Sequence, residues 1–239
     1  MIKYDEKRYE TYMQLPHADE VKKYLELQSV LKIVSENPNI SQILDIGTAT
    51  GRYPILFAKK KYEVTGIDIS DDALTIASNN VMKERVSDKV NLFKMDATEL
   101  DFPENSFDLI TCMMGTICHM NQEQYEHFLK KVKYILKPRG FVIISSWDPD
   151  CSFTEFLSFY NEQEKVKLKN NSMSAIEFKK LMDSIFPYAK IQNIIPFSDE
   201  QMASFQPDNE FEAFLGIQEY IYSRITNKMG QMYLAIGYK

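Results

Sequence analysis

The chain has 239 residues, of which 34 are acidic and 28 basic, so its formal net charge is −6; 44% of the residues are hydrophobic. This balance is ordinary for a globular protein and disfavours nucleic acid as a substrate, because a phosphate-binding surface needs positive charge. The first residues lack the apolar core of a signal peptide, and no apolar run approaches the ~20 residues that span a bilayer. We therefore expect a cytoplasmic protein with no membrane partner, folded as one α/β domain over residues 1–239.

The cysteine pattern excludes two further classes. Cys112, Cys118 and Cys151 are odd in number and form no Cys-x-x-Cys pair. A disulfide framework or a zinc site is therefore not expected, and we predict no metal.

Residues 1–37 are predicted to be helical. Apolar side chains recur at near-helical spacing between Val21 and Ile33, and Asn37-Pro38-Asn39 ends the pattern. Pro16 separates this helix from an earlier segment that carries Tyr9 and Tyr12. Packing against the core is the simplest role for these tyrosines.

The most informative stretch is residues 43–53, where a buried strand runs through small residues directly into a helical pattern. Gly47 and Gly51 permit backbone angles that a Cβ penalises, and the small side chains between them let a ligand lie against the peptide. The stretch predicts a cofactor-binding loop; the alternative is a tight turn between strand and helix.

Acidic residues follow the next two predicted strands. Asp68 ends the strand at 62–69, 21 residues after Gly47, and that separation returns the chain to the neighbouring strand end in a doubly wound sheet. A carboxylate there can accept hydrogen bonds from both ribose hydroxyls of an adenosine cofactor. Capping of the following turn is the alternative, but Ser70 already supplies that cap. Asp96 and Ala97 likewise follow the strand at 89–95.

A fourth strand at 107–113 leads into a segment that contains His119. An imidazole with the ordinary pKa of ~6.5 can take a proton near neutral pH, so His119 is a candidate general base or substrate orienter. The alternative is a structural histidine that caps the next helix or binds a backbone carbonyl.

The rest of the chain completes an α/β pattern. A helix with a period near 3.6 opens at Asn121, residues 137–140 are predicted as a turn, and an apolar strand follows at 141–145. Ser174 begins a capping box. Residues 189–196 and 231–238 are predicted as strands of an antiparallel edge, with a helix at 211–225 between them.

The sequence Leu44 to Tyr53, LDIGTATGRY, resembles motif I of the class I S-adenosylmethionine-dependent methyltransferases, Asp-x-Gly-x-Gly-x-Gly, with Ala49 in place of the middle glycine. The run CMMGTICHM at 112–120 is similar to the corresponding stretch of glycine N-methyltransferases, and the chain also resembles methyltransferases of ubiquinone and menaquinone biosynthesis. A nicotinamide-dependent oxidoreductase is disfavoured because it needs Gly-x-Gly-x-x-Gly.

The resemblance implies a Rossmann-like seven-stranded sheet, mostly parallel with an antiparallel last strand, and helices on both faces plus helical lid insertions. It implies S-adenosyl-L-methionine as cofactor and S-adenosyl-L-homocysteine as product. Residues 1–37 are expected to form a lid, 41–146 the cofactor-binding core, and 147–173 and 197–228 the substrate-side insertions. The expected cofactor-binding residues are Asp45, Gly47, Thr48, Ala49, Gly51, Asp68, Ile69, Asp96, Ala97 and Met113. The expected substrate-pocket residues are Tyr9, Tyr12, Met114, Thr116 and Trp147.

The function implied is methyl transfer to N or O of a small-molecule acceptor by in-line displacement, with His119 as the candidate catalytic residue. No Asn-Pro-Pro-Tyr-like stretch follows the fourth strand, which argues against methylation of base or amide nitrogens. The alternative is a noncatalytic protein that binds S-adenosylmethionine or a partner. A monomer or a homodimer is expected.

Overall fold

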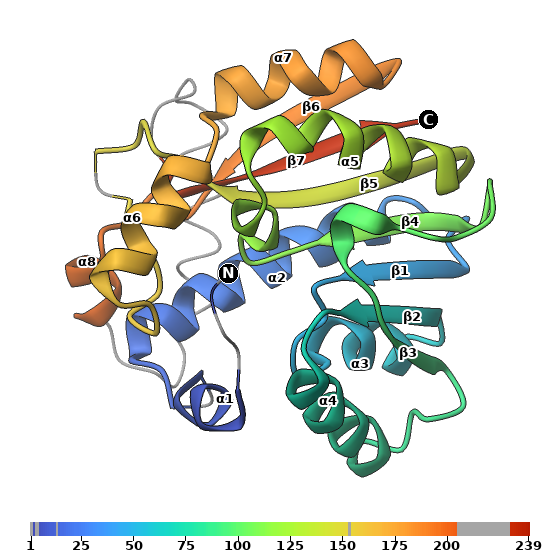
Figure 1. The fold of residues 1–239 in the computed structure, drawn as a ribbon, viewed down its shortest axis with the longest axis horizontal. Helices are drawn as coiled ribbons and strands as arrows, with labels where there is room; N and C mark the ends of the chain where they lie inside the picture. Colours follow the sequence, from blue (N-terminus) through green and yellow to red (C-terminus); the bar gives the residue numbers. More distant parts are fainter. Residues whose placement is uncertain (1, 3–4, 13, 153, 205–229) are drawn as a thin grey trace.

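The fold, taken from a computed structural model, is built on one seven-stranded sheet in the order β3-β2-β1-β4-β5-β7-β6 (Figure 1). Strands β1 to β5 pair in parallel, and β7 runs antiparallel to both of its neighbours. The predicted mostly parallel sheet with an antiparallel last strand is therefore confirmed. The strands are β1 (Gln42–Ile46), β2 (Glu63–Asp68), β3 (Val90–Lys94), β4 (Phe107–Cys112), β5 (Leu136–Trp147), β6 (Tyr188–Ile194) and β7 (Met232–Tyr238). The structure describes residues 2, 5–12, 14–152, 154–204 and 230–239.

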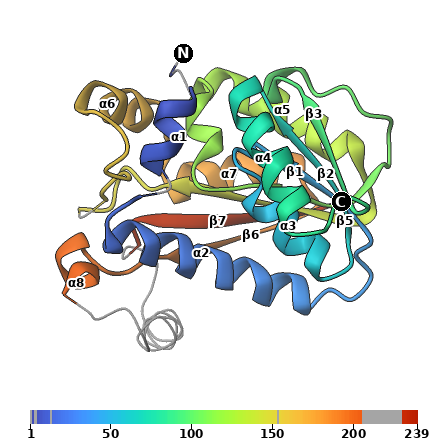
Figure 2. The same cartoon turned by 90° about the horizontal axis from the view of Figure 1, so that it is seen from below.

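Helices cover both faces of the sheet, as the sequence predicts. In Figure 2, α5 and α7 lie on one side of β7 and α2 lies along the other. Helix α3 packs on β2, and α4 packs on β3. The α-helices are α1 (Glu6–Tyr12), α2 (His17–Ser35), α3 (Arg52–Lys59), α4 (Asp71–Lys83), α5 (Gln122–Ile135), α6 (Glu162–Asn171), α7 (Ala175–Ile185) and α8 (Asp199–Ala203), with short 3₁₀ helices η1 (Ala97–Glu99) and η2 (Thr116–His119).

Local capping signals fix where several helices begin. The Ser70 hydroxyl accepts a hydrogen bond from the backbone N–H of Ala73 at the start of α4. Asn121 and Ser174 form the capping boxes of α5 and α7. These side chains satisfy backbone donors that have no partner within the helix, so the helix starts can be read from sequence.

Residues 137–140, predicted as a turn, belong to β5 instead. The chain passes from the end of α5 at Ile135 directly into the strand, and Leu136 already pairs with Phe107 of β4. The register then shifts, so residues 137–140 bulge opposite Asp108 before pairing resumes. Pairing with β4 thus extends the strand through a segment whose composition alone indicates a turn.

The segments beyond the carboxyl end of β5 return to the N-terminus of the chain. Helix α6 lies near α1 on the left of Figure 1, and the Arg8 guanidinium of α1 binds the Glu164 carboxylate of α6 at 2.6 and 2.7 Å. The predicted helix at 211–225 and most of the predicted insertion 197–228 lie outside the described residues. No helix among the described residues is long and apolar enough to cross a membrane.

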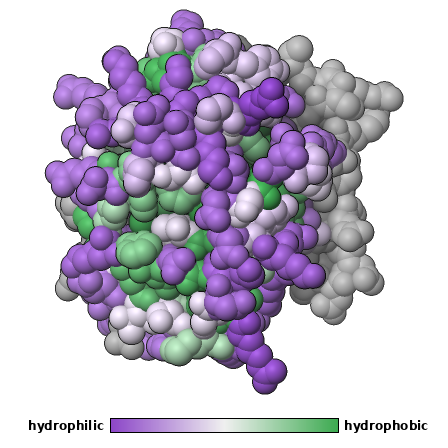
Figure 3. All heavy atoms as spheres, turned by 90° about the vertical axis from the view of Figure 1, so that its right-hand side faces the viewer, coloured by the Kyte–Doolittle hydropathy of each residue, from purple (hydrophilic) through white to green (hydrophobic). Residues whose placement is uncertain are grey.

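Figure 3 views the right-hand side of Figure 1, where hydrophilic side chains surround an apolar area in the middle of the face.

Candidate cofactor and substrate site

The loop between β1 and α3 forms the floor of a cavity of about 290 Å³. Gly47 and Gly51 adopt left-handed backbone angles, with φ of 73° and 85°. A Cβ on Gly47 would lie 2.4 Å from Cγ2 of Thr116, so only glycine fits there without displacing that side chain. Ala49, which replaces the family's middle glycine, tolerates a φ of 46° and lines the cavity. The substitution therefore leaves the loop open to a ligand.

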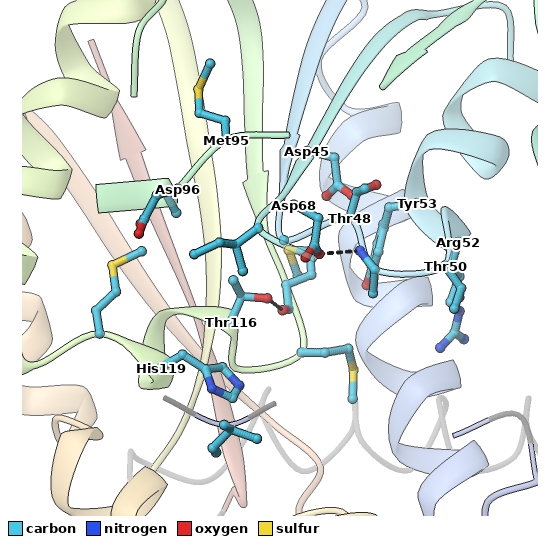
Figure 4. Close-up of a pocket in the computed structure, with 18 of the residues that line it drawn as sticks. Asp45, Thr48, Thr50, Arg52, Tyr53, Asp68, Met95, Asp96, Thr116 and His119 are labelled. Atoms are coloured by element: carbon cyan, nitrogen blue, oxygen red, sulfur yellow. Dashed lines mark hydrogen bonds between the residues drawn. The ribbon is translucent and has the colours of Figure 1, made fainter. Parts of the chain in front are cut away.

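Asp68, the last residue of β2, faces the same cavity. Its Oδ2 accepts a hydrogen bond from the Ala49 N–H at 2.8 Å, and its Oδ1 accepts one from the Ser70 N–H at 3.0 Å (Figure 4). Burial raises the pKa of Asp68, while these backbone donors oppose the rise. Each carboxylate oxygen can accept more than one hydrogen bond, so the side chain can also serve a ligand hydroxyl.

Residues that follow β2 and β3 line the cavity beside Asp68. Met95, Asp96, Ala97 and Ile69 all line the cavity, and the Ile69 side chain is 43% exposed despite its size. The Asp96 Oδ1 accepts hydrogen bonds from both the N–H and the hydroxyl of Thr98 at 2.8 Å. Apolar walls with one carboxylate at the edge suit a flat heterocycle that carries an amino group.

The segment after β4 forms the opposite wall. Met113, Met114 and Thr116 line the cavity, and the Thr116 hydroxyl donates to the Met113 carbonyl at 2.7 Å. Gly115 packs so closely on Trp147 that a Cβ would lie 2.5 Å from the indole Nε1. Trp147, predicted in the substrate pocket, therefore supports this wall from behind and does not line the cavity.

Two buried carboxyl groups lie beneath the wall. Burial raises the pKa of Asp45 to about 7, although the Thr111 hydroxyl donates a 2.7 Å hydrogen bond to it. Glu26 of α2 accepts hydrogen bonds from the Tyr53 hydroxyl and the Met114 N–H, both at 2.8 Å, and burial raises its pKa. Glu26 thus connects the N-terminal helix to two segments of the cavity.

The far end of the cavity is lined mainly by aromatic side chains and methionine. Tyr9, Phe159, Tyr160 and Met120 line it together with His119, whose Nε2 lies 3.4 Å from the Tyr160 hydroxyl. Burial, together with the positive charges of Lys167 and Arg8, lowers the pKa of His119 to about 4, while the negative charge of Glu164 opposes the shift. The expectation of an ordinary pKa near 6.5 is therefore wrong, because the ring is desolvated by burial and stays neutral at physiological pH.

Most of the predicted site residues meet in this one cavity. It is lined by Asp45, Gly47, Thr48, Ala49, Asp68, Ile69, Asp96, Ala97, Met113, Met114, Thr116, His119 and Tyr9. Gly51 lies behind the loop, where a Cβ would contact Ala77 at 3.2 Å, and Trp147 also lies outside the lining. Tyr12 ends α1, and its side chain lies outside the described residues.

Sequence reasoning missed Glu26, Arg52 and Tyr53. Arg52 and Tyr53 line the cavity, and Glu26 hydrogen-bonds to Tyr53. The signal for Glu26 was present: it lies one helical turn after Lys22 and one before Val30, and all three are buried on the same face of α2. A charged residue on a buried helical face needs a polar partner elsewhere in the fold, so its presence indicates a buried polar site. Among the described residues, no group of three or more His, Cys, Asp or Glu side chains is arranged to hold a metal ion.

A sheet of this order, with a glycine loop and acidic strand ends around one cavity, defines the fold of the class I S-adenosylmethionine-dependent methyltransferases. Residues 43–140 match the family model described as a methyltransferase domain. A demethylmenaquinone methyltransferase from Bacteroides fragilis is 32% identical over 105 residues, which are 43% of this chain and 42% of that protein. The matches span about half or less of the length of such curated relatives.

Two solved structures share the fold. A Thermotoga maritima S-adenosylmethionine-dependent methyltransferase superposes with a TM-score of 0.65 at 21% identity, covering 98% of this chain and 97% of its own. Haemonchus contortus phosphoethanolamine N-methyltransferase 2, in complex with phosphomonomethylethanolamine and S-adenosylhomocysteine, gives 0.63 at 20% identity, covering 89% and 52%. The chain therefore has the fold of the class I S-adenosylmethionine-dependent methyltransferases, as its sequence predicts, and its residues 43–140 are similar to the methyltransferase domain family. The fold and the matched family model both disfavour the alternative of a nicotinamide-dependent oxidoreductase.

Proposed function

We propose that the cavity binds S-adenosyl-L-methionine and that the protein transfers its methyl group to N or O of a small-molecule acceptor. One observation carries the proposal: the glycine loop after β1, Asp68 at the end of β2 and Asp96 after β3 all face one cavity. In this assignment Asp68 binds the ribose hydroxyls, Asp96 the adenine amine, and Gly47 to Ala49 the methionine end. S-Adenosylhomocysteine is the product that would remain.

The chemistry places modest demands on the protein. The bound sulfonium supplies a methyl group already activated for displacement. The residues of this chain have to align the acceptor atom with that methyl group and exclude water, and such alignment contributes ~7 to 11 kcal/mol to catalysis. Met113, Met114 and the aromatic side chains at the far end form the apolar walls that this task needs.

His119 is the residue proposed to contact the acceptor. Because burial keeps its ring neutral, it can accept a hydrogen bond or a proton from an acceptor O–H or N–H, with the Tyr160 hydroxyl beside it. A positioned base with a pKa near the operating pH contributes ~10² to 10⁴ in rate, and the lowered pKa of His119 reduces that gain. Because the neutral ring is a weak base, we propose that it takes the proton as the methyl group transfers, when the acceptor becomes more acidic.

Transfer of labelled methyl tests the proposal. The protein is incubated with S-[methyl-³H]adenosylmethionine and a metabolite extract, and label in the extracted small molecules is counted, with Asp68→Asn and Asp72→Asn as the paired variants. Asp72 is an exposed acid of α4, four residues along from Asp68. We expect label with wild type and Asp72→Asn and little with Asp68→Asn. Binding of S-adenosylmethionine without transfer into any extract would favour the noncatalytic alternative.

A second candidate reaction is methylation of a ring carbon in a quinone-like acceptor. It is favoured by the 32% identity to a demethylmenaquinone methyltransferase, which covers 43% of this chain. Carbon NMR of the product made with ¹³C-methyl cofactor separates the candidates, because methyl groups on carbon, nitrogen and oxygen have distinct chemical shifts. A methyl group on ring carbon would replace the N- or O-transfer proposal.

A further inference from the structure

We infer that Glu26 of α2 is a positioning residue of the proposed methyltransferase site, because its carboxyl group fixes the Met114 backbone and the Tyr53 side chain in the cavity lining. Glu26 itself is not among the described residues that line the cavity, so it acts through these two neighbours. The inference rests on the proposed function and adds to it a residue behind the site.

Each oxygen of the Glu26 carboxyl group has its own partner in the cavity lining. Its Oε1 accepts a hydrogen bond from the Met114 N–H at 2.8 Å, and its Oε2 accepts one from the Tyr53 hydroxyl at 2.8 Å. Met114 follows β4, whereas Tyr53 is the second residue of α3 and lies beside the glycine loop (Figure 4). One side chain of α2 therefore fixes two segments of the cavity that are far apart in the sequence.

The turn after β4 needs such a contact because its backbone is in an unfavourable conformation. Met114 has a φ of 52° and Gly115 a φ of 70°, so two successive residues are left-handed. A residue with a Cβ keeps this conformation only where its surroundings hold it. Glu26 holds the Met114 N–H, and the Ser145 hydroxyl accepts the Gly115 N–H at 3.4 Å. Glu26 therefore stabilises the turn that places Met113 and Met114 in the cavity lining.

The burial of Glu26 indicates that packing alone does not account for an acid at this position. The side chain is fully buried, and burial raises its pKa, while the hydrogen bonds that it accepts and the charge of Arg52 oppose the rise. A well-packed apolar side chain at a buried position is often as stabilising as an ionisable one, or more so. The hydrogen bonds to the cavity lining are therefore the reason for a carboxyl group here.

The same face of α2 also contacts the far end of the cavity. Asp19, two helical turns before Glu26, is buried, and it accepts hydrogen bonds from the N–H and the hydroxyl of Ser158 at 2.9 and 2.8 Å. Ser158 lies between Leu157 and Phe159, which both line the cavity. Helix α2 thus holds both ends of the cavity, and Glu26 fixes the end assigned to the cofactor.

Calorimetric titration with S-adenosylhomocysteine tests the role of Glu26. Glu26→Leu keeps the approximate volume of the side chain but leaves the Met114 N–H without its acceptor. Glu26→Gln can retain both contacts, because its amide oxygen can accept from Met114 and its amide N–H can donate to the Tyr53 hydroxyl oxygen. Tyr53→Phe removes one of the two contacts and leaves the other.

Asp108→Leu is the matched control. The Asp108 carboxylate also accepts hydrogen bonds from two backbone N–H groups, at the start of β1, but it lies near the amino end of β4, at the opposite end of the sheet from the cavity. Thermal melting shows which variants are folded and how much each is destabilised. A comparison of Glu26→Leu with Asp108→Leu therefore separates an effect on the site from a general loss of stability.

We expect Glu26→Leu to bind S-adenosylhomocysteine about 10- to 100-fold more weakly than wild type, because the ligand must restore a turn that is then only about 1–10% in its binding conformation. Glu26→Gln should stay within about threefold of wild type, and Tyr53→Phe should lose about 3- to 10-fold. Tyr53→Phe should add little to the loss in Glu26→Leu, because both changes remove the same contact. Asp108→Leu should bind as wild type does.

Wild-type affinity in folded Glu26→Leu, or an equal loss in Asp108→Leu, would overturn the positioning role and leave the proposed function intact. An equal loss in Glu26→Gln and Glu26→Leu would also overturn it, because the contacts that Gln retains would then not matter. If Glu26→Leu does not fold, Tyr53→Phe takes its place, and wild-type affinity there would contradict the inference. If wild type does not bind S-adenosylhomocysteine, the proposed function fails, and this inference fails with it.

Discussion

The contact between Gly47 and Thr116 offers a quantitative test of the cavity floor. In Gly47→Ala, the new Cβ would lie 2.4 Å from Cγ2 and 2.7 Å from Oγ1 of Thr116, on a backbone with φ of 73°. The left-handed conformation costs an alanine ~1–2 kcal/mol, and forcing the threonine aside adds ~1–3 kcal/mol. Gly51→Ala has a similar φ of 85°, but its nearest contact is a milder 3.2 Å. We therefore expect Gly47→Ala to destabilise the fold by ~2–5 kcal/mol and Gly51→Ala by ~1–2 kcal/mol.

A double-mutant cycle with Thr116→Ala isolates the clash. The truncation removes the two closest atoms and leaves Cβ of residue 116 at 3.1 Å, so Gly47→Ala in that background should lose mainly the backbone contribution, giving a coupling of ~1–3 kcal/mol. Urea unfolding at fixed pH measures all four proteins, and the loss of the Thr116 hydrogen bond to Met113 cancels within the cycle. Additivity within ~0.5 kcal/mol would refute the close packing of the two loops.

Three further predictions concern buried ionisable side chains. Because burial raises the pKa of Asp45 to about 7, the folded state binds this proton more tightly than the unfolded state. The free energy of unfolding of wild type should therefore fall relative to that of Asp45→Asn as the pH rises from 4 to 7. Parallel plots of unfolding free energy against pH for the two proteins would contradict this. His119, with its pKa lowered to about 4, should show no midpoint of ring protonation between pH 5 and 8 in an NMR titration. A midpoint above 6 would contradict the burial of the ring. Lys22 is fully buried and forms ion pairs with Asp19 and Asp199, so Lys22→Ala should lower the free energy of urea unfolding by ~3–5 kcal/mol. Lys32→Ala, at an exposed position of the same helix, should lower it by less than ~0.5 kcal/mol. Equal losses would show that the ion pairs of Lys22 do not stabilise the fold.

Local patterns predicted the sheet and the strand ends well. The glycine loop and Asp68 were predictable because a parallel sheet brings the carboxyl ends of adjacent strands to one edge. The same rule anticipated that Asp96 would face the cavity. Helix starts at Asn121 and Ser174 followed from side chains that cap the nearby backbone.

Features that depend on distant contacts were not predictable in this way. The bulge at 137–140 is set by pairing with β4, and Glu26 meets Met114 across 88 residues of sequence. The position of Trp147 depends on its packing against Gly115. The low pKa of His119 reflects burial and neighbours from other helices, which the spacing of residues along the chain does not reveal.

Calorimetric titration of S-adenosylhomocysteine into wild type, Asp68→Asn and Asp72→Asn tests the central claim most directly. Convergence of three strand ends on one nucleoside cavity predicts binding of one ligand per chain, with Asp68→Asn about 10- to 100-fold weaker and Asp72→Asn unchanged. Absence of binding to folded wild type, or equal affinity for all three proteins, would contradict it.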